Sequence, residues 1–410
     1  MDELRLIAVG NVDDGKSTLL GRLLYDSKVM FRDHLDALLR ASTRQGQELN
    51  LALITDGLRR EREQGITIDV AYRFFATKKR KFVVIDAPGH FQYTRNMVTG
   101  ASTADVGLIL VDATQGVQEQ TKRHFYLLSL LRVPHVIVCV NKMDLVDYSL
   151  AAFEKVQREF ATLAANVKFE SLQFIPVSSI HGENVVRKSA LMPWFSGTPV
   201  LDTLETLNVG DNDGGAFRFA IQGSLAITQK RHASTGMVLR GAARVGDEVF
   251  VLPERKRTRI AAIHRFPETP DHCKAGESIA LELEGNLNPG RGATAVSAQP
   301  DEPRVSANVK ATGCWFAKTP LKKGATFLLR VATQEIRCQI DELEDKLNVH
   351  TLSRECGTDS LETNDIGTIR LKLSTPVVFD SYSVSKLTGS GILMDEATNA
   401  TVAALMLEKN

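Results

Sequence analysis

The sequence of 410 residues predicts an α/β domain with a mainly parallel sheet and helices on both faces, followed by two small antiparallel β-barrels. Three observations support this fold class. Short apolar runs alternate with longer helical patterns over residues 4–200, which is typical of a parallel sheet covered by helices. Residues 208–215 have the composition of a linker. Beyond them, short alternating strands are broken by Gly and Pro at intervals typical of small barrels.

The elements of the α/β domain follow from hydrophobic periodicity. Apolar runs predict buried strands at Leu4–Val9, Phe82–Ile85, Gly107–Val111, His135–Val140 and Phe174–Val177. Helical patterns predict helices at Lys16–Leu24, Gln92–Gly100, Gln118–Leu131 and Phe153–Ala165. Several of these strands are followed directly by short segments of polar residues and glycine, which are candidates for binding and catalytic sites.

Two breaks divide the chain. The linker at 208–215 ends the first domain, and Ala298–Pro303 splits the β-rich region into two pieces of about a hundred residues, near the usual domain size. The predicted domains are therefore residues 1–207, 208–300 and 301–410. Representative barrel strands are Phe217–Gln222, Thr235–Leu239, Glu248–Leu252 and Ile279–Leu283.

Composition argues against several classes of protein. Hydrophobic residues at 43% and charged residues at 24% are ordinary for globular domains. Lys+Arg 50 against Asp+Glu 49 leaves a net charge of +1, which argues against an electrostatically driven binder of nucleic acid or of a membrane surface. No apolar stretch approaches about 18 residues and no basic segment follows Met1, so we expect neither a membrane span nor a secretion signal.

The five cysteines are widely spaced and odd in number, which describes neither a disulfide framework nor a zinc site. We therefore expect a reducing compartment and a cytoplasmic protein. Cys139 lies inside a predicted core strand and is interpreted as an inert buried thiol. The basic clusters Lys78–Lys81 and Arg255–Arg259 lie near predicted hairpin turns, and solvated turns are favoured over the alternative of an anion site.

A phosphate-binding loop is predicted near the N-terminus. The segment Gly10-Asn11-Val12-Asp13-Asp14-Gly15-Lys16-Ser17 fits G-x-x-x-x-G-K-[ST], between a predicted strand and a predicted helix, as the motif requires. Its glycines let successive backbone N–H groups and the helix N-terminus face phosphates. Lys16 supplies a point charge, and the Ser17 hydroxyl is expected to ligate Mg²⁺. A glycine-rich turn arising by chance is the alternative, and the motifs that follow reduce its weight.

Two further segments are expected to sense the γ-phosphate. In Asp86-Ala87-Pro88-Gly89-His90, which follows a predicted strand, the Asp86 carboxylate can hold Mg²⁺ through water, and Gly89 can offer its N–H to the γ-phosphate. Thr67 follows a charged run, Arg59–Gln64, that is interpreted mostly as a solvated helix face. A hydroxyl in a mobile segment can complete the Mg²⁺ shell only while the γ-phosphate is present, so Thr67 is a candidate switch residue.

The segment Asn141-Lys142-Met143-Asp144 follows the predicted strand His135–Val140 and favours GTP over ATP. The two carboxylate oxygens of Asp144 can accept from both the N1–H and the amino group of guanine, a donor pair that adenine lacks. Ser178-Ser179-Ile180 follows another strand, where a backbone N–H could meet the guanine O6. Taken alone that signal is weak, because a Ser pair that ends a strand is often a helix N-cap.

With these motifs in order, the first 200 residues resemble the GTPase domain of the translation-factor class, which includes elongation factors Tu and 1-alpha. Within that class, the chain is most similar to the GTPase subunits of bacterial sulfate adenylyltransferase. The resembling segments are Val12–Leu19, Asp56–Leu58, Glu61–Arg73, Gln92–Met97, Met192–Gly197 and Val377–Leu407. Coverage is nearly the whole chain and is dense at both ends.

Three features depart from that family. The chain starts almost at the first strand, where the family has a longer arm. Phe217–Leu225 keeps the family's opening of the second domain but lacks the Asn-Arg-Pro segment that follows. Asn11 replaces the family's usual Ser. The first two departures bear on the docking of a partner and leave the nucleotide chemistry untouched.

The resemblance implies a GTPase subunit that binds GTP or GDP with Mg²⁺. GTP hydrolysis on it would drive adenylyl transfer from ATP to sulfate on a smaller catalytic partner subunit, which yields adenylylsulfate and diphosphate. It also implies that His90 orients the attacking water, as the matching histidine does in elongation factors; a histidine that only caps the following helix is the alternative. A membrane partner is not expected, and a nucleic-acid partner is disfavoured.

Three sets of candidate residues result. The catalytic candidates are Lys16, Thr67 and His90, and the metal ligands are Ser17, Thr67 and Asp86. The nucleotide-binding candidates are Gly10, Asn11, Val12, Asp13, Asp14, Gly15, Lys16, Ser17, Thr18, Asp86, Ala87, Pro88, Gly89, His90, Asn141, Lys142, Asp144, Ser178, Ser179 and Ile180.

Two other functions stay open at the level of sequence. One is an elongation-factor relative that delivers aminoacyl-tRNA, whose nucleotide site would look the same. Three features argue against it: Asp14, which stands where elongation factors usually carry His, the Gln92–Met97 segment, and the near-neutral barrels. The other is a regulatory GTPase that has left sulfate activation, which the altered second domain favours.

Overall fold

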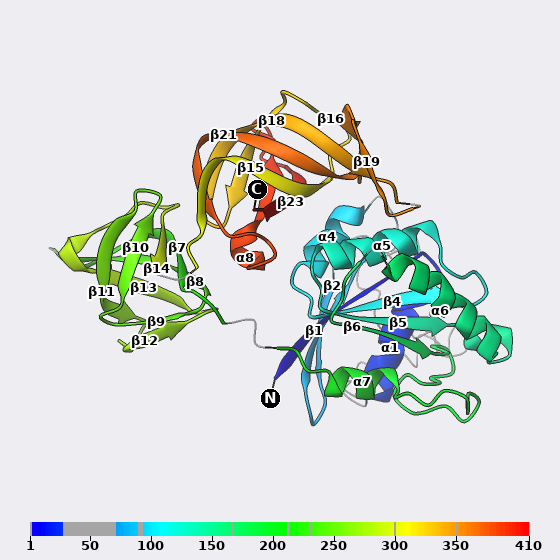
Figure 1. The fold of residues 1–410 in the computed structure, drawn as a ribbon. Coiled ribbons are helices and arrows are strands. Elements are labelled where there is room, and N and C mark those ends of the chain that lie inside the picture. The colour runs from blue at the N-terminus through cyan, green and yellow to red at the C-terminus, as the bar shows by residue number, and fades with distance from the viewer. Residues whose placement is uncertain are drawn as a thin grey trace. The chain divides into compact units, whose positions relative to one another are not determined.

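A computed structural model describes residues 2–27, 71–88, 93–165, 167–210, 214–229, 231–298, 301–349 and 351–409 (Figure 1). The chain forms two compact units, Met1–Val209 with Asn348–Ser353, and Gly210–Leu347 with Arg354–Asn410. The predicted limits of the three domains stay predictions. None of the helices in the described part of the chain has the length and apolar character that crossing a membrane requires.

The first unit is built on a six-stranded sheet of order β2-β3-β1-β4-β5-β6. Its strands are β1 (Glu3–Gly10), β2 (Ala71–Ala76), β3 (Lys81–Asp86), β4 (Val106–Asp112), β5 (His135–Asn141) and β6 (Ser171–Pro176). Neighbours from β3 through β6 pair in parallel, whereas β2 is antiparallel to β3. The mainly parallel sheet that the sequence predicts is confirmed. Hydrophobic pattern did not predict β2, because Tyr72 and Phe74 are exposed on this edge strand.

Helices cover both faces of this sheet (Figure 1). They are α1 (Lys16–Asp26), α4 (Thr94–Ala101), α5 (Glu119–Leu130), α6 (Leu150–Ala164) and α7 (Val200–Thr206), with a 3₁₀ turn η3 (Met143–Val146). Leucines of α1 and α7 share one core with β1 and β3. β4 and β5 are buried at every position, which explains their continuous apolar runs. Because β1, β4 and β5 are parallel neighbours, their carboxyl ends lie together at one edge of the sheet.

The second unit contains two antiparallel barrels, as predicted. The first is a closed barrel of order β10-β11-β13-β8-β7-β14. Its strands are β7 (Arg218–Thr228), β8 (Arg231–Arg240), β10 (Glu248–Leu252), β11 (Lys256–His264), β13 (Ser278–Leu283) and β14 (Thr294–Ser297). The short strands β9 (Ala242–Arg244) and β12 (His272–Lys274) pair beside it. Its core is separate from that of the next barrel.

The second barrel is a seven-stranded sheet of order β17-β22-β23-β15-β21-β18-β19, and pairing of β17 with β18 closes it. Its strands are β15 (Arg304–Trp315), β17 (Thr326–Val331), β18 (Gln334–Leu347), β19 (Arg354–Cys356), β21 (Ile366–Phe379), β22 (Ser390–Met394) and β23 (Thr401–Glu408). A small ladder joins β16 (Leu321–Lys322) to β20 (Ser360–Leu361), and one helical turn, α8 (Lys386–Gly389), precedes β22.

One basic turn differs from the expectation of a solvated cluster. Arg80, in the turn between β2 and β3, is only 5% exposed. Its guanidinium donates to the carbonyls of Leu204 at 3.0 Å and Leu207 at 2.6 Å, which closes the C-terminus of α7. The interpretation is therefore wrong for Arg80, because this cation satisfies helix carbonyls. It is confirmed for Arg255 and Arg257, whose side chains are 61% and 68% exposed. The thiol of Cys139 is buried, as predicted.

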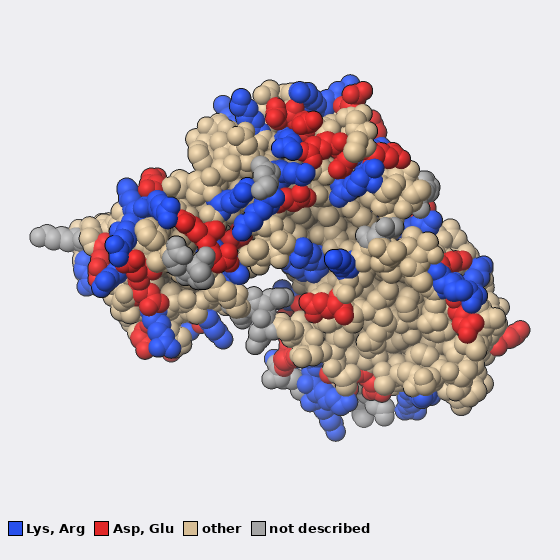
Figure 2. Space-filling view, in the orientation of Figure 1, with Lys and Arg blue, Asp and Glu red and all other residues tan. Residues whose placement is uncertain are grey.

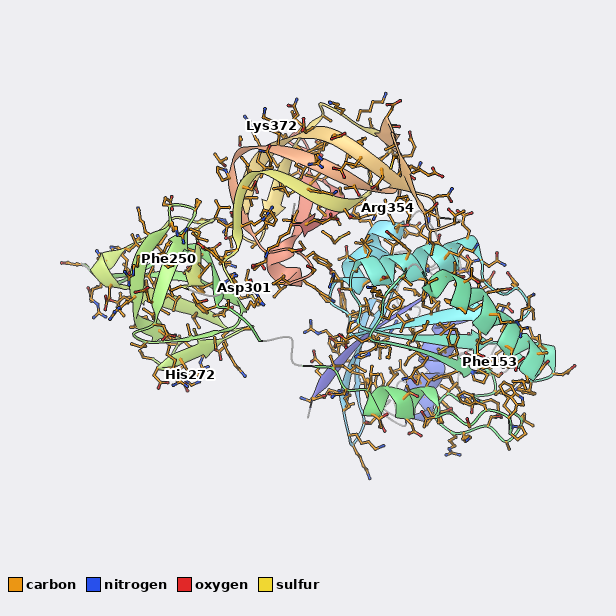
Figure 3. The ribbon with its side chains drawn as sticks, in the orientation of Figure 1. Phe153, Phe250, His272, Asp301, Arg354 and Lys372 are labelled. Carbon is orange, nitrogen blue, oxygen red and sulfur yellow. The ribbon has the colours of Figure 1, made fainter. Side chains whose placement is uncertain are left out.

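A buried ion pair joins the two barrels of the second unit. The Arg218 guanidinium, 0% exposed, donates to both carboxylate oxygens of Asp380 at 3.0 Å. Asp380 also accepts from the Thr388 hydroxyl at 2.8 Å, and Arg218 donates to the carbonyl of Asp301, a residue labelled in Figure 3. Such pairs are costly to break on one side only, because the remaining charge stays buried without compensation.

Replacement of Arg218 by Met should lower the free energy of unfolding by about 3–5 kcal/mol, because it strands the Asp380 carboxylate. Chemical denaturation followed by circular dichroism measures the loss. Arg330→Met is the matched control, since its pair with Glu335 is solvent-exposed and contributes little. Equal stabilities of the two variants would contradict a structural role for the buried pair.

Candidate functional site

The predicted phosphate loop connects β1 to α1 and curls as the motif requires. Asp13 and Gly15 adopt positive φ angles of 68° and 91°. A Cβ built on Gly15 would lie 2.4 Å from the Asn141 amide nitrogen, so this position needs Gly. α1 begins at Lys16 and has no acidic residue in its first turn. The N–H groups of a first helical turn have no carbonyl acceptor within the helix and point back toward the preceding loop, which suits an anion.

Lys16 is held across the loop by backbone carbonyls. Its ammonium donates to the carbonyl oxygens of Asn11 at 2.7 Å and Gly10 at 3.2 Å, and the residue is only 8% exposed. Burial lowers the pKa of Lys16, while the nearby carboxylates of Asp14 and Asp86 oppose this change. A cation therefore lies inside the loop, and its role toward a phosphate stays a prediction.

Asp14 closes the loop onto itself. Its Oδ2 accepts the backbone N–H of Asn11 at 2.6 Å, and the residue is 4% exposed. Burial raises the pKa of Asp14, whereas the Asn11 hydrogen bond and the Lys16 ammonium oppose the rise. Asn11 in turn accepts the N–H of Val12 through its side-chain oxygen at 2.9 Å. The loop is thus shaped by its own side chains.

Asn141 connects three segments that lie far apart in the sequence. Its amide nitrogen donates to the carbonyl of Asp14 at 2.8 Å. Its amide oxygen accepts the N–H of Ser179 at 3.0 Å and the Ser179 hydroxyl at 2.8 Å. The side chain is buried at the end of β5. One amide therefore fixes the phosphate loop against the segment predicted to contact the base.

The same segment positions Asp144. The Ser178 hydroxyl donates to Oδ1 of Asp144 at 2.5 Å, and Ser178 is fully buried. Ile180, two residues on, is 55% exposed. Asp144 lies in η3 and is half-buried, so its carboxylate is oriented yet accessible. This geometry suits recognition of a pair of N–H donors on a planar ring.

Two oxygen donors could hold a divalent cation. Asp86 ends β3 at the same edge of the sheet as the phosphate loop and is 1% exposed, and Ser17 lies in the first turn of α1. A carboxylate and a hydroxyl form a hard donor set that fits Mg²⁺. Ala87, next to Asp86, donates its N–H to the carbonyl of Ala8 on β1 at 3.3 Å, which ties this segment to the sheet.

Three predicted residues, Thr67, Gly89 and His90, lie outside the described residues. Their roles stay predictions. The other candidates from the phosphate loop, the Asp86 segment, the Asn141 segment and the Ser178 segment belong to the first unit. Lys142 follows Asn141 in a left-handed conformation with φ 61°, and its ammonium pairs with Asp112 at 2.8 Å.

Sequence reasoning missed two residues that support this site. Arg22 on α1 donates to the carbonyls of Ile180 at 3.1 Å and His181 at 3.3 Å. No local pattern could reveal this contact, because 158 residues separate Arg22 from Ile180. The other is Asp112, the partner of Lys142. The sequence did hold a signal for Asp112. This residue directly follows the apolar run Gly107–Val111, so it ends a predicted strand at the sheet edge where the other motifs lie.

Comparison with known proteins adds independent findings. The family described as "Elongation factor Tu GTP binding domain" matches residues 2–209, and the family "GTP-eEF1A C-terminal domain-like" matches residues 308–408. A protein of Francisella tularensis subsp. tularensis (strain WY96-3418), named "Sulfate adenylyltransferase subunit 1", is 43% identical over 410 residues, which cover 99% of this chain and 87% of that protein.

Two further relatives are similar over the same span. The "Sulfate adenylyltransferase subunit 1" of Alteromonas mediterranea is 41% identical and is covered to 87% of its length. The "Bifunctional enzyme NodQ" of Rhizobium meliloti (strain 1021) is 41% identical over 409 residues, but only 64% of that protein is covered.

Removal of the Asn141 side chain should uncouple the phosphate loop from the Ser178 segment. Asn141→Ala leaves buried groups of Asp14 and Ser179 without their partner, so we expect a loss of about 1–3 kcal/mol in the free energy of unfolding. Hydrogen exchange should also show faster exchange of the Ser179 N–H. Asn308→Ala, at an exposed position of β15, is the control. Unchanged exchange at Ser179 would rule out the bridge.

Proposed function

The chain belongs to the family of elongation factor Tu-type GTP-binding proteins and, over nearly its whole length, to that of sulfate adenylyltransferase subunit 1, and we propose that it is the GTP-hydrolysing subunit of a heteromeric sulfate adenylyltransferase. The observation that supports this most strongly is the identity of 43% across 99% of the chain. The site described above agrees with it, since Asn141 joins the phosphate loop to Ser179, whose neighbour Ser178 donates to the Asp144 carboxylate.

Guanine selection is assigned to Asp144. Its carboxylate would accept the N1–H and the amino group of the base, with Ser178 fixing the orientation of the carboxylate. The backbone near Ile180 would meet O6, and the Arg22 contacts would keep the neighbouring carbonyls turned away. These roles account for the contacts that Asp144 and Arg22 of α1 make with the segment Ser178–His181.

Phosphate binding is assigned to the loop and to Lys16. The backbone N–H groups of residues 10–18 would hold the phosphate oxygens, and Lys16 would exchange its carbonyl partners for them. Ser17 and Asp86, with Thr67, would hold Mg²⁺, which supplies charge neutralisation to the γ-phosphoryl oxygens. His90 would orient the water that attacks the γ-phosphate.

A partner subunit is proposed to carry out the adenylyl transfer. The name "subunit 1" of the relatives implies a second subunit of their enzyme. We assign to this chain the same arrangement: GTP hydrolysis here would drive the uphill transfer of an adenylyl group from ATP to sulfate on a smaller catalytic subunit. Adenylylsulfate and diphosphate are the products. Release of the γ-phosphate would free the Thr67 and Gly89 contacts and so report hydrolysis to the partner.

Delivery of aminoacyl-tRNA is not favoured. The relatives of Francisella tularensis that match 99% of this chain and are covered to 87% of their own length are named sulfate adenylyltransferase subunit 1. On the face shown in Figure 2, Lys and Arg side chains are interspersed with Asp and Glu over the second unit, which differs from the basic stripe expected of an RNA-binding surface.

Asp144→Asn should shift base preference from guanine to xanthine. The amide nitrogen would face the guanine donors, and loss of two charged hydrogen bonds should weaken GTP binding about 100-fold or more. Xanthosine triphosphate, which presents a carbonyl in place of the amino group, should bind better than GTP. Titration with both nucleotides measures the shift, with the exposed Asp147→Asn as the control. Unaltered GTP affinity would refute the guanine assignment.

Reconstitution tests the proposed function as a whole. The chain is mixed with a candidate small subunit, ATP, sulfate and Mg²⁺, and adenylylsulfate is measured with and without GTP. We expect GTP to raise product formation at equilibrium, because hydrolysis supplies the driving force. Product formation indifferent to GTP would remove the coupling. Tight, salt-sensitive binding of tRNA would instead support the elongation-factor alternative.

A further inference from the structure

Asp112 is a buried carboxylate with a preorganised set of donors. Its Oδ1 accepts the N–H of Thr114 at 2.8 Å and the Thr114 hydroxyl at 2.7 Å. Its Oδ2 lies 2.8 Å from the Lys142 ammonium, and its side chain is only 3% exposed. Burial alone would raise the pKa of Asp112, but the hydrogen bonds from Lys142 and Thr114 hold it below its ordinary value. The Asp112 carboxylate is therefore ionised, and its Oδ2 is positioned to accept a hydrogen bond from the Lys142 ammonium.

Parallel pairing brings the two residues together. Asp112 ends β4, and its register partner Asn141 ends β5, directly before Lys142. The N–H of Ala113 donates to the carbonyl of Asn141 at 2.9 Å, which fixes the spacing of the two strand ends. The left-handed conformation of Lys142 begins the turn that leads to Asp144. The ammonium thus has one partner set by the sheet and another carboxylate two residues away along the chain.

That second carboxylate is the one assigned to guanine. A Lys ammonium is a strongly charged donor on a flexible stem, so it pairs with whichever carboxylate offers the best geometry. Asp144 is half-buried and held by Ser178, and an ammonium on it would occupy the acceptor that the base needs. Asp14 is another carboxylate that the charge of Lys142 reaches, but it already accepts the Asn11 N–H inside the loop.

We propose that Asp112 is a positioning residue of the base site, which sequesters the Lys142 ammonium and so keeps the Asp144 carboxylate available to guanine. This inference rests on the proposed guanine-nucleotide function and adds a residue outside the nucleotide motifs to it. In this arrangement the Lys142 stem stays fixed between β5 and Asp112. Selectivity for the 2-amino group of guanine then depends on the carboxylate of Asp112, which lies 32 residues before Asp144 in the sequence.

The test is a double-variant cycle read by nucleotide binding. Asp112→Asn keeps the shape of the side chain but removes its charge, and Lys142→Met keeps an apolar stem but removes the ammonium. GDP and IDP are titrated into the wild type, each variant and the double variant, since hypoxanthine lacks the 2-amino group. We expect D112N to weaken GDP binding about tenfold, the effect of losing one charged hydrogen bond. It should also lower the preference for GDP over IDP.

The cycle separates sequestration from mere support of the fold. If Asp112 acts through the ammonium, D112N has no further effect on the GDP:IDP preference once Lys142 is Met. A purely structural role predicts the same loss in both backgrounds, and that result would overturn the proposal. Thr114→Val is a milder second variant, because it removes one hydrogen bond that orients Asp112 and leaves both charges in place. We expect a smaller change in the same direction.

Asp395→Asn is the matched control. Asp395 accepts the N–H and the hydroxyl of Thr398, as Asp112 does from Thr114, but lies in the second barrel. It should leave both nucleotide affinities unchanged. If the wild type ignores GDP, the proposed function fails, and this inference fails with it. If the wild type binds GDP and D112N binds it equally well with the same preference, the inference alone is wrong.

Discussion

The amide of Asn141 is the constraint on which the candidate site depends. A parallel sheet places the ends of β1, β4 and β5 side by side, but neighbouring strand ends do not by themselves fix the loops that follow them. Asn141 does so with both halves of one amide, because it donates to the phosphate loop at Asp14 and accepts from Ser179. A buried amide with both halves paired is rigid and specific, and a half-paired one would be costly.

Around that amide, the charges are arranged as compensated groups. Lys16 lies on backbone carbonyls with Asp14 and Asp86 near it, and Lys142 lies on Asp112. Charges taken out of water need such partners, or they neutralise. The partners keep each cation in one place before any ligand binds, although Lys16 would still have to exchange its carbonyl partners for phosphate oxygens.

The second unit uses the same physics for a different purpose. Arg218 and Asp380 are buried where the two barrels of this unit meet, and their charges are matched by two-point geometry and by further hydrogen bonds. Such a pair adds specificity of orientation, since alternative dockings would leave a charge without its partner. The exposed ion pairs of the barrels, such as Arg330 with Glu335, cannot impose such a constraint, because water competes for both groups.

The sequence by itself determined the α/β domain, the two barrels and the residues of the phosphate and base motifs, because these depend on local periodicity and on contiguous patterns. Only the tertiary structure decided which side chains support them. Arg80 caps α7 instead of facing water, Arg22 reaches Ile180 across 158 residues, and Asp112 meets Lys142 on the neighbouring strand. The physical reason is that these groups are defined by partners distant in sequence. Short-range preference says what a residue can do, while packing and burial select which donor meets which acceptor.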